Sequence, residues 1–242
     1  MLSILIPIYN QDVTKLVMTL VKQCNKAGIR YQILCFDDGS IEKYKQLNKV
    51  LGQTIHVNYT ELQENLGRSR IRNWLGKAAY FEYLLFLDGD TKITSNAFIK
   101  TYVQQLDTDT VISGGRIYSK SKPRSPKKFL HWKYGSTRES LKAKKRNKNP
   151  YMNFHSNNFV IPAHIFAKYP FDQQVVGYGY EDTLYAEKLK FGNIKIKHID
   201  NPTVHTGLEN ADVFIKKTIN ATDNLAKLYS DAKLKETRLI KL

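Results

Sequence analysis

The chain has 242 residues, enough to bury a substantial core within one domain. Hydrophobic residues make up 42% and charged residues 25%, an ordinary globular composition that argues against intrinsic disorder. The formal net charge of +16 is concentrated, because residues 114–150 hold 13 Lys or Arg and one acid, Glu139. A charge confined to one segment argues against a general nucleic-acid-binding protein and indicates a local anionic partner.

No apolar run is long enough to predict a membrane span. The apolar run near the N-terminus, residues 2–9, is broken by Pro7 and lacks a basic lead and a cleavage site, so it predicts a strand and not a signal peptide. Cys24 and Cys35 are too few for a disulfide framework and lie in apolar stretches. They predict buried free thiols in a reducing compartment, the cytoplasm.

Strands and helices alternate through the first half of the predicted fold. Strands come from short apolar runs and helices from apolar residues at helical spacing, with Ser40 and Ser95 placed as N-caps. The expected strands span residues 2–8, 31–36, 55–59, 83–87 and 111–113, and the expected helices 13–28, 41–51, 67–79 and 96–106.

The second half has a looser pattern. The basic segment, residues 114–150, shows no clean period and is expected to be irregular. Beyond it the sequence predicts a strand at 158–161, a short helix opened by Pro162, a helix at 181–191 ended by Gly192, a strand at 194–199 and a closing helix at 212–229.

Strands separated by helices predict an α/β fold, a Rossmann-like and mainly parallel sheet flanked by helices. Such sheets bind ligands beyond the carboxyl ends of their strands. With no internal repeat or flexible linker, we expect one domain, 1–242, with a nucleotide-binding half at 1–113 and an acceptor-binding half at 114–242.

Acidic motifs follow two of these predicted strands. Asp37 and Asp38 precede Gly39 and Ser40, where a carboxylate can accept a hydrogen bond from a base or simply brace the turn. Asp88 and Asp90 flank Gly89, and residues two apart on an extended chain share a face. Two such carboxylates suit Mg²⁺ or Mn²⁺ bound to phosphates, although a polar turn after a buried strand is the simpler interpretation.

Three further motifs add basic, acidic and imidazole groups. Arg68 and Arg72 are four apart at a helix start, where both can meet a base or a diphosphate. Glu181 and Asp182 open another helix after a Gly-aromatic loop, and only one of them can face a substrate. A neutral His205 can complete a metal site if it lies beside Asp90. Each motif alone is also explained by a solvated helix face, a helix-dipole acid or a structural histidine.

Together, in this order, the motifs resemble the family 2 glycosyltransferases of the GT-A fold over nearly the whole chain. The resemblance depends on Ile6-Pro7-Ile8-Tyr9-Asn10, Asp37-Asp38-Gly39-Ser40, Asn65-Leu66-Gly67 with Arg72-Asn73, Asp88-Gly89-Asp90, Glu181-Asp182 and His205. The loop Gly177-Tyr178-Gly179-Tyr180-Glu181-Asp182 also resembles that of metazoan-type galactosyltransferases.

The resemblance implies an inverting, metal-dependent transfer of one sugar from a nucleotide-diphosphate sugar, with UDP favoured, to a hydroxyl of a glycan or lipid-linked acceptor. Asp182 would be the general base, and Glu181 would orient the acceptor or the loop. Mn²⁺ or Mg²⁺ would be held by Asp90 and His205, with Asp88 reaching the metal or the ribose. Donor contacts would come from Pro7, Tyr9, Asp38, Asn65, Arg68, Arg72 and Asp88.

Departures from the family pattern bear on the acceptor. His155-Ser156-Asn157-Asn158 replaces the usual glycine-rich acceptor loop, and Ile71 stands where Ala is common. The Gln-x-x-Arg-Trp motif of processive synthases is absent, which favours single addition, in a setting such as cell-surface polysaccharide assembly. The alternatives are a non-catalytic nucleotide-binding or anionic-polymer-binding protein and a nucleotidyltransferase; nucleic acid is not an expected partner. The basic segment is either a solvated loop or a contact with anionic lipid at the inner membrane face.

Overall fold

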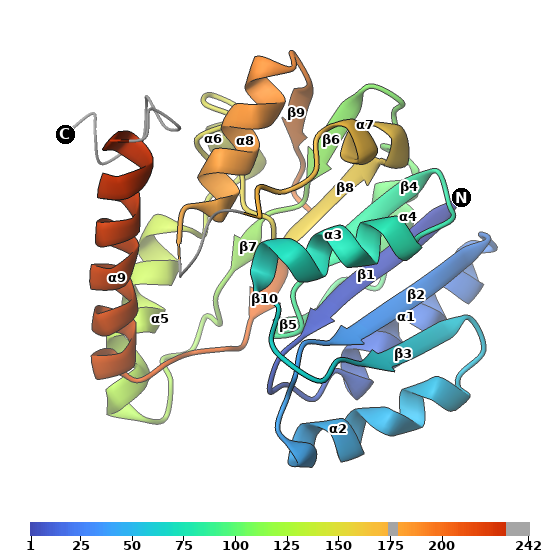
Figure 1. Ribbon diagram of the computed structural model, residues 1–242, viewed down its shortest axis with the longest axis horizontal. Coiled ribbons are helices and arrows are strands. Elements are labelled where there is room, and N and C mark those ends of the chain that lie inside the picture. The colour runs from blue at the N-terminus through green and yellow to red at the C-terminus, as the bar shows by residue number, and fades with distance from the viewer. Residues whose placement is uncertain (174–178, 231–242) are drawn as a thin grey trace.

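The computed structural model describes residues 1–173 and 179–230 (Figure 1). The first half alternates strands and helices as expected. Its elements are β1 (Leu2–Ile8), α1 (Thr14–Ala27), β2 (Tyr31–Asp37), α2 (Glu42–Asn48), the 3-10 turn η1 (Lys49–Gln53), β3 (Val57–Glu61), α3 (Arg68–Ala78), β4 (Tyr83–Leu87), β5 (Thr91–Lys92), α4 (Phe98–Val103) and β6 (Thr110–Ser113).

The second half is more regular than its sequence suggests. Its elements are β7 (Arg116–Ile117), the 3-10 turn η2 (Pro126–Lys128), α5 (Phe129–Arg138), α6 (Ala143–Arg146), β8 (Asn158–Pro162), α7 (Ala163–Lys168), α8 (Glu181–Phe191), β9 (Lys195–His198), β10 (Thr203–His205) and α9 (Ala211–Ser230). The expectation of an irregular basic segment was therefore wrong. Helix α5 shows no helical spacing of hydrophobic residues, because its buried positions are His131 and Gly135.

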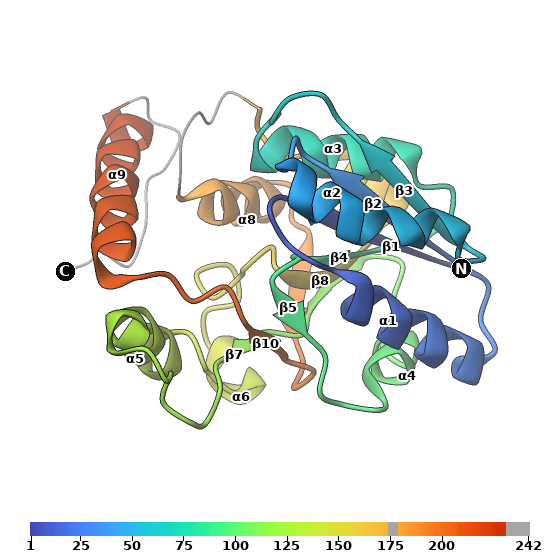
Figure 2. The same cartoon turned by 90° about the horizontal axis from the view of Figure 1, so that it is seen from below.

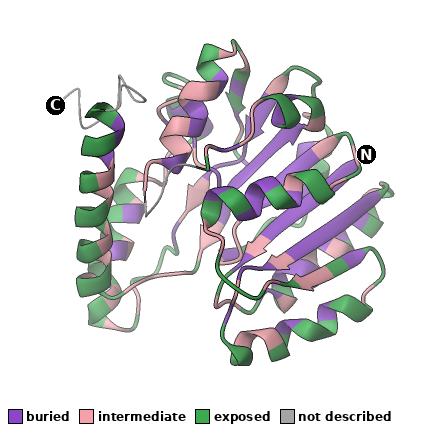
Figure 3. Cartoon of the chain, viewed as in Figure 1, coloured by how far each residue is buried: buried purple, intermediate pink, exposed green. Residues whose placement is uncertain are grey.

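The main sheet has the strand order β3-β2-β1-β4-β8-β6-β9, and β1 to β4 run parallel to one another. Strand β8 is antiparallel to both β4 and β6, while β6 and β9 are parallel, so the sheet is mostly parallel as predicted. Helices cover both faces (Figure 2): α1 and α4 pack on one apolar cluster, and α3, α7 and α8 pack on the other. Figure 3 shows the strands buried between them.

A second, three-stranded sheet of order β5-β10-β7 lies beyond the end of β4. Its strands are only two or three residues long, which is below the length at which a sequence pattern is legible. They come from 91–92, 116–117 and 203–205, so only tertiary structure joins them. This sheet holds the two halves of the chain together next to the motifs described above.

Neither serine caps its helix in the way the sequence suggests. Helix α2 begins at Glu42 after Ile41, and the Ser40 hydroxyl instead accepts a hydrogen bond from the Asn10 amide. Ser95 bonds the amide of Ala97, but α4 begins only at Phe98 and ends at Val103. Ser40 therefore ties two loops together, a long-range role that local capping rules cannot anticipate.

Both cysteines are buried and free, as expected. Burial raises the pKa of the Cys24 thiol to about 12, so this group stays protonated and unreactive. Within the described residues, no helix is both long and apolar enough to cross a bilayer.

Arg146 shows that part of the basic segment is core structure. Its guanidinium donates to the carbonyls of Ser113, Gly114 and Ile199, and its Nε donates to Leu141. These groups lie where β6 ends and where the chain leaves β9. One side chain thus donates hydrogen bonds to four backbone carbonyl groups.

Replacing Arg146 with Met should lower the free energy of unfolding by about 3 kcal/mol or more, because buried carbonyls lose their donor. The measurement is equilibrium urea unfolding. Lys145→Met is the matched control, since Lys145 is exposed on the same helix and its loss should change stability by less than about 0.5 kcal/mol. Equal destabilisation by the two substitutions would contradict this role.

Candidate active site

The acidic motifs meet at the carboxyl end of the parallel strands, where sheet topology places ligand sites. Asp88 follows β4, and its amide donates to the carbonyl of Asn157, just before β8. This bond continues the β4–β8 register, in which Leu87 faces Asn158. The sequence 155–158 is thereby brought to the same edge as the Asp88-Gly89-Asp90 turn.

Asp88 is held by both arginines of α3. Arg72 donates to Asp88 Oδ1, and the Arg68 guanidinium lies 3.7 Å from Oδ2. Arg72 is only 1% exposed and also donates to the carbonyl of Arg68. The two arginines do share a face, but Arg72 reaches Asp88 from the protein interior. It positions this carboxylate, and Arg68 is the more accessible cation.

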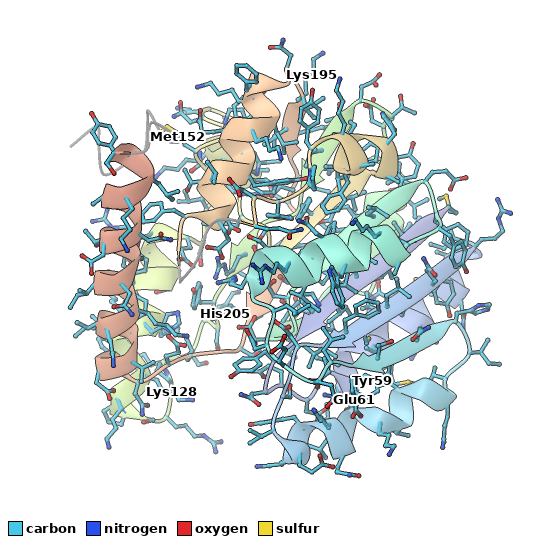
Figure 4. The ribbon with its side chains drawn as sticks, viewed as in Figure 1. Tyr59, Glu61, Lys128, Met152, Lys195 and His205 are labelled. Carbon is cyan, nitrogen blue, oxygen red and sulfur yellow. The ribbon has the colours of Figure 1, made fainter. Side chains whose placement is uncertain are left out.

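Asp90 and His205 lie together, as the resemblance implied. The antiparallel register of β5 and β10 sets His205 opposite Thr91, so its Nδ1 comes within 3.3 Å of Asp90 Oδ1. The amide and hydroxyl of Thr206 both donate to the Asp90 carbonyl. Burial tends to raise the pKa of Asp90, but His205, Arg116 and Arg68 hold it below its usual value. Figure 4 shows His205 near the centre of the molecule.

Gly207 lies beside Asp90, and the sequence analysis assigned it no role. A Cβ on this residue would lie 2.4 Å from Asp90 Oδ2, closer than side-chain carbons approach oxygen. The His205-Thr206-Gly207 sequence therefore packs along Asp90 with all three residues. The spacing of His and Gly after a short strand was the available signal.

We expect Gly207→Ala to displace Asp90 and to weaken manganese-dependent nucleotide affinity about tenfold, a magnitude typical for disturbing the support of a metal ligand. Isothermal titration calorimetry with UDP and Mn²⁺ measures the effect. Gly52→Ala is the control, because a Cβ there meets nothing within 4 Å. Unchanged affinity in the Gly207 variant would show that Asp90 is not held by this contact.

The donor set fits a divalent metal ion of the magnesium or manganese type. Among the described residues, no group of three or more His, Cys, Asp or Glu side chains is close enough to enclose an ion. Asp90 and His205 are adjacent, however, while Asp88 is turned to the arginines. One or two protein ligands are what such ions use when substrate phosphates and water complete their coordination.

The two acids at the start of α8 face different partners. Glu181 is buried and its Oε1 lies 2.8 Å from Arg68 Nε, so it links α8 to α3. Asp182 Oδ2 lies 3.8 Å from His155 Nδ1, and its Oδ1 is buried without a hydrogen-bond partner among the described residues. Gly177 and Tyr178 of the preceding loop lie outside the described residues.

Asp182 is ionised in this environment. Burial alone would raise its pKa, but the neighbouring His155 imidazole and the charges of Arg68 and Arg72 hold it well below its usual range. His155 belongs to the sequence that replaces the usual glycine-rich loop. Its position beside Asp182 is the structural consequence of that departure, and no local pattern predicted it.

Asp38 and Asn65 join the loop after β2 to the loop after β3 at this edge of the sheet. Asp38 accepts hydrogen bonds from the amides of Leu66 and Gly67, and Asn65 donates to the Asp38 carbonyl. Burial raises the pKa of Asp38. Gly39 is required here because its φ is +73° and a Cβ would meet the backbone of Glu64. These loops are preorganised by Asp38.

The loop after β1 approaches the same edge. The carbonyl of Pro7 lies 3.3 Å from where a Cβ of Gly89 would be, so Pro7 contacts the acidic turn. Tyr9 is 54% exposed and lies one residue before Asn10, whose side chain accepts from the Ile41 amide. The structure thus brings Pro7 close to Asp88 and Asp90 and leaves the Tyr9 ring accessible.

A buried cluster of Arg116, Tyr118 and Glu139, which the sequence did not predict, packs against His205. Arg116 Nε lies 3.5 Å from Glu139, and Tyr118 donates to the same carboxylate at 2.6 Å. The Tyr118 ring packs against His205, with 5.3 Å between ring centroids. Glu139, the single acid of the basic segment, therefore fixes the wall that supports His205.

Comparisons with known proteins identify the family and the fold. The family model described as glycosyl transferase family 2 matches residues 3–169. Chondroitin synthase from Escherichia coli is 28% identical over 137 residues, which are 54% of this chain and 20% of that protein. The chain thus spans about a fifth of the length of this relative.

Solved structures share the fold at low sequence identity. S. aureus TarS 1-349 in complex with UDP-GlcNAc is 18% identical, with a TM-score of 0.63 over 86% of this chain and 59% of that one. The mannosyltransferase PcManGT from Pyrobaculum calidifontis, in complex with GDP-Man and Mn²⁺, is 13% identical, with a TM-score of 0.65 over 98% and 65%. The α/β architecture is therefore that of the GT-A glycosyltransferases. Because the family model matches residues 3–169, this chain belongs to glycosyl transferase family 2.

Proposed function

We propose that the protein is an inverting, metal-dependent glycosyltransferase that moves one sugar from a nucleotide-diphosphate sugar to a hydroxyl of a glycan or lipid-linked acceptor. One observation carries the proposal: Arg68 bridges Asp88 of the acidic turn and Glu181 of α8. This bridge brings Asp182, the next residue, to the acidic edge of the sheet. Asp88 and Asp90 on the donor side and the candidate base Asp182 of α8 would then border one site.

The roles of the residues follow from their contacts. Asp182 Oδ1, buried and without a hydrogen-bond partner among the described residues, would accept the acceptor proton, while His155 and the arginines keep the carboxylate ionised. Glu181 fixes Arg68, which faces the donor diphosphate. Asp90 and His205 would hold Mn²⁺ or Mg²⁺, and Asp88 would reach the metal or the ribose. The ion, when bound, neutralises charge developing on the leaving diphosphate.

The donor's nucleotide would lie over the loops that Asp38 organises. Pro7, Tyr9 and Asn65 border this region, and Arg72 acts through Asp88 because it is itself buried. A UDP-sugar is the favoured donor, since TarS, which shares the fold, is solved with UDP-GlcNAc. PcManGT is solved with GDP-Man, so GDP is the competing nucleotide. The single-domain organisation, with donor half 1–113 and acceptor half 114–242, is part of this proposal.

A thermal-shift panel of UDP, GDP, CMP and ATP, with and without Mn²⁺, tests the donor site. At a ligand concentration 100 times Kd, binding adds about 2.7 kcal/mol of stability. For a chain of this size that predicts a rise in Tm of about 5 °C or more with UDP and Mn²⁺. If neither UDP nor GDP raised Tm, or if the rise in Tm did not depend on Mn²⁺, the result would contradict the proposal.

Transfer itself separates this enzyme from a non-catalytic nucleotide-binding subunit. Release of UDP from a UDP-sugar in the presence of acceptor glycans would demonstrate turnover, whereas nucleotide binding without release would favour the subunit. Cell-surface polysaccharide assembly is the proposed setting, with the protein in the cytoplasm. Its basic segment, residues 114–150, would contact anionic membrane there.

A further inference from the structure

Helix α5 has an outward face that the proposed reaction does not use. Its inward positions are His131 and Gly135, and the latter leaves room for Tyr118, whose ring would lie 2.0 Å from a Cβ there. Phe129, Leu130 and Tyr134 are 41%, 41% and 49% exposed. We define the α5 outer face as these three residues with Lys133, one turn from Phe129 and Leu130, with Arg138, one turn from Tyr134, and with Lys122 beside Phe129.

The α5 outer face is strongly basic. Residues 119–138 contain seven Lys or Arg and no Asp or Glu. The next residue, Glu139, is already bound to Arg116 and Tyr118. The ammonium group of Lys122 lies 5.8 Å from the centre of the Phe129 ring, so cation and apolar surface are adjacent. Among the described residues, neither Lys122 nor Lys133 forms a salt bridge.

This combination points to one class of partner. The phosphates of a nucleic acid or the anionic groups of a glycan would pair with the Lys and Arg side chains of this face. They would leave Phe129 and Leu130 exposed to water. The interface of an anionic phospholipid bilayer takes both, because headgroups attract Lys and Arg while the acyl boundary accepts aromatic and aliphatic side chains. We propose that the α5 outer face binds the surface of an anionic phospholipid bilayer.

The inner side of α5 packs against the candidate active site. His131 packs 5.5 Å from His205, between ring centroids, and stacks on Phe214 of α9. One helix, which lies beside α9 (Figure 1), therefore contacts His205 through His131 and would contact lipid through its other face. A bilayer docked there would bring a lipid-linked acceptor to the site, a consequence that rests on the proposed function. The membrane contact itself does not.

The test is sedimentation of the full chain with vesicles of phosphatidylcholine alone and with 30% phosphatidylglycerol, at low and high salt. We expect binding only to the anionic vesicles, weakened by salt. Phe129→Ser with Leu130→Ser keeps the charge and should lower the vesicle partition coefficient at least fivefold. Lys133→Glu with Arg138→Glu should lower it more than tenfold. Lys144→Glu with Lys145→Glu, the same charge change on α6, should lower it less than threefold.

The outcomes are distinct. No sedimentation with anionic vesicles at low salt overturns the proposal, and so does wild-type partitioning by the Phe129 and Leu130 double variant. Equal losses from the α5 and α6 charge variants would mean that net charge alone acts, and would also overturn it. Binding of the same variants to a DNA duplex controls for a general polyanion site. Thermal melts with UDP and Mn²⁺ check each variant's fold and report the donor site separately.

Discussion

Asp182→Asn should lower the turnover number for sugar transfer by about 10²–10⁴-fold while leaving nucleotide affinity nearly unchanged. The carboxamide keeps the shape of the side chain but cannot accept the acceptor proton, and positioned general bases contribute rate factors of that size. Asp182 does not contact the candidate metal ligands in any described hydrogen bond or ion pair, so donor binding should persist. The measurements are UDP release under saturating donor and calorimetric affinity for UDP with Mn²⁺.

Glu187→Gln is the matched control for this substitution. Glu187 lies on the same helix and its described ion pair is with Lys190, so its neutralisation should leave turnover within about twofold. His155→Asn tests the support of Asp182, because it removes the imidazole that lies 3.8 Å from the Asp182 carboxylate. Because the pKa of Asp182 is held low, its carboxylate should stay ionised from pH 8 down to pH 5. Near-normal turnover in Asp182→Asn would remove it as the base.

Asp90→Asn should weaken manganese-dependent UDP affinity by about 100-fold or more. Disturbing residues that merely support a metal ligand commonly costs 10–100-fold, and loss of the ligand's own charge should cost at least as much. The amide retains the volume that packs against Gly207, so a folding defect is not the expected cause. Titration of UDP at several Mn²⁺ concentrations measures the effect.

Asp109→Asn is the control for Asp90, since Asp109 is exposed in a turn remote in sequence from the site. Its UDP affinity should match that of the wild type at every Mn²⁺ concentration. Binding of UDP without Mn²⁺ should be equally weak in the wild type and in Asp90→Asn. An Asp90 variant that keeps full manganese dependence would mean that the ion is held elsewhere.

The regular core could be predicted from local pattern because its signals are local. Apolar runs such as residues 2–8 and 83–87 are buried on both faces of the sheet, so they stand out as continuous hydrophobic stretches. The order of strand and helix then predicted the parallel arrangement and the edge of the sheet at which Asp88 and Asp90 lie. The carboxylates were found because strand ends in such sheets converge.

Pairings between distant parts of the chain could not be predicted in this way. The pairing of β5 with β10 that sets His205 beside Asp90 joins segments more than 100 residues apart, each too short for a period. The antiparallel direction of β8, which carries 155–158 to the site, likewise depends on contacts and not on composition.

The sequence by itself determined the α/β class, the buried thiols, the family and the set of acidic and basic groups available, because these depend on residue types and their spacing. Only the tertiary structure decided which groups face each other: Arg72 is buried under Asp88, Ser40 bonds Asn10 rather than a helix end, and Arg146 serves the core rather than a surface partner. The physical reason is that a buried charged or hydroxyl side chain must form hydrogen bonds with the polar groups that are buried beside it. Which groups those are depends on the whole fold.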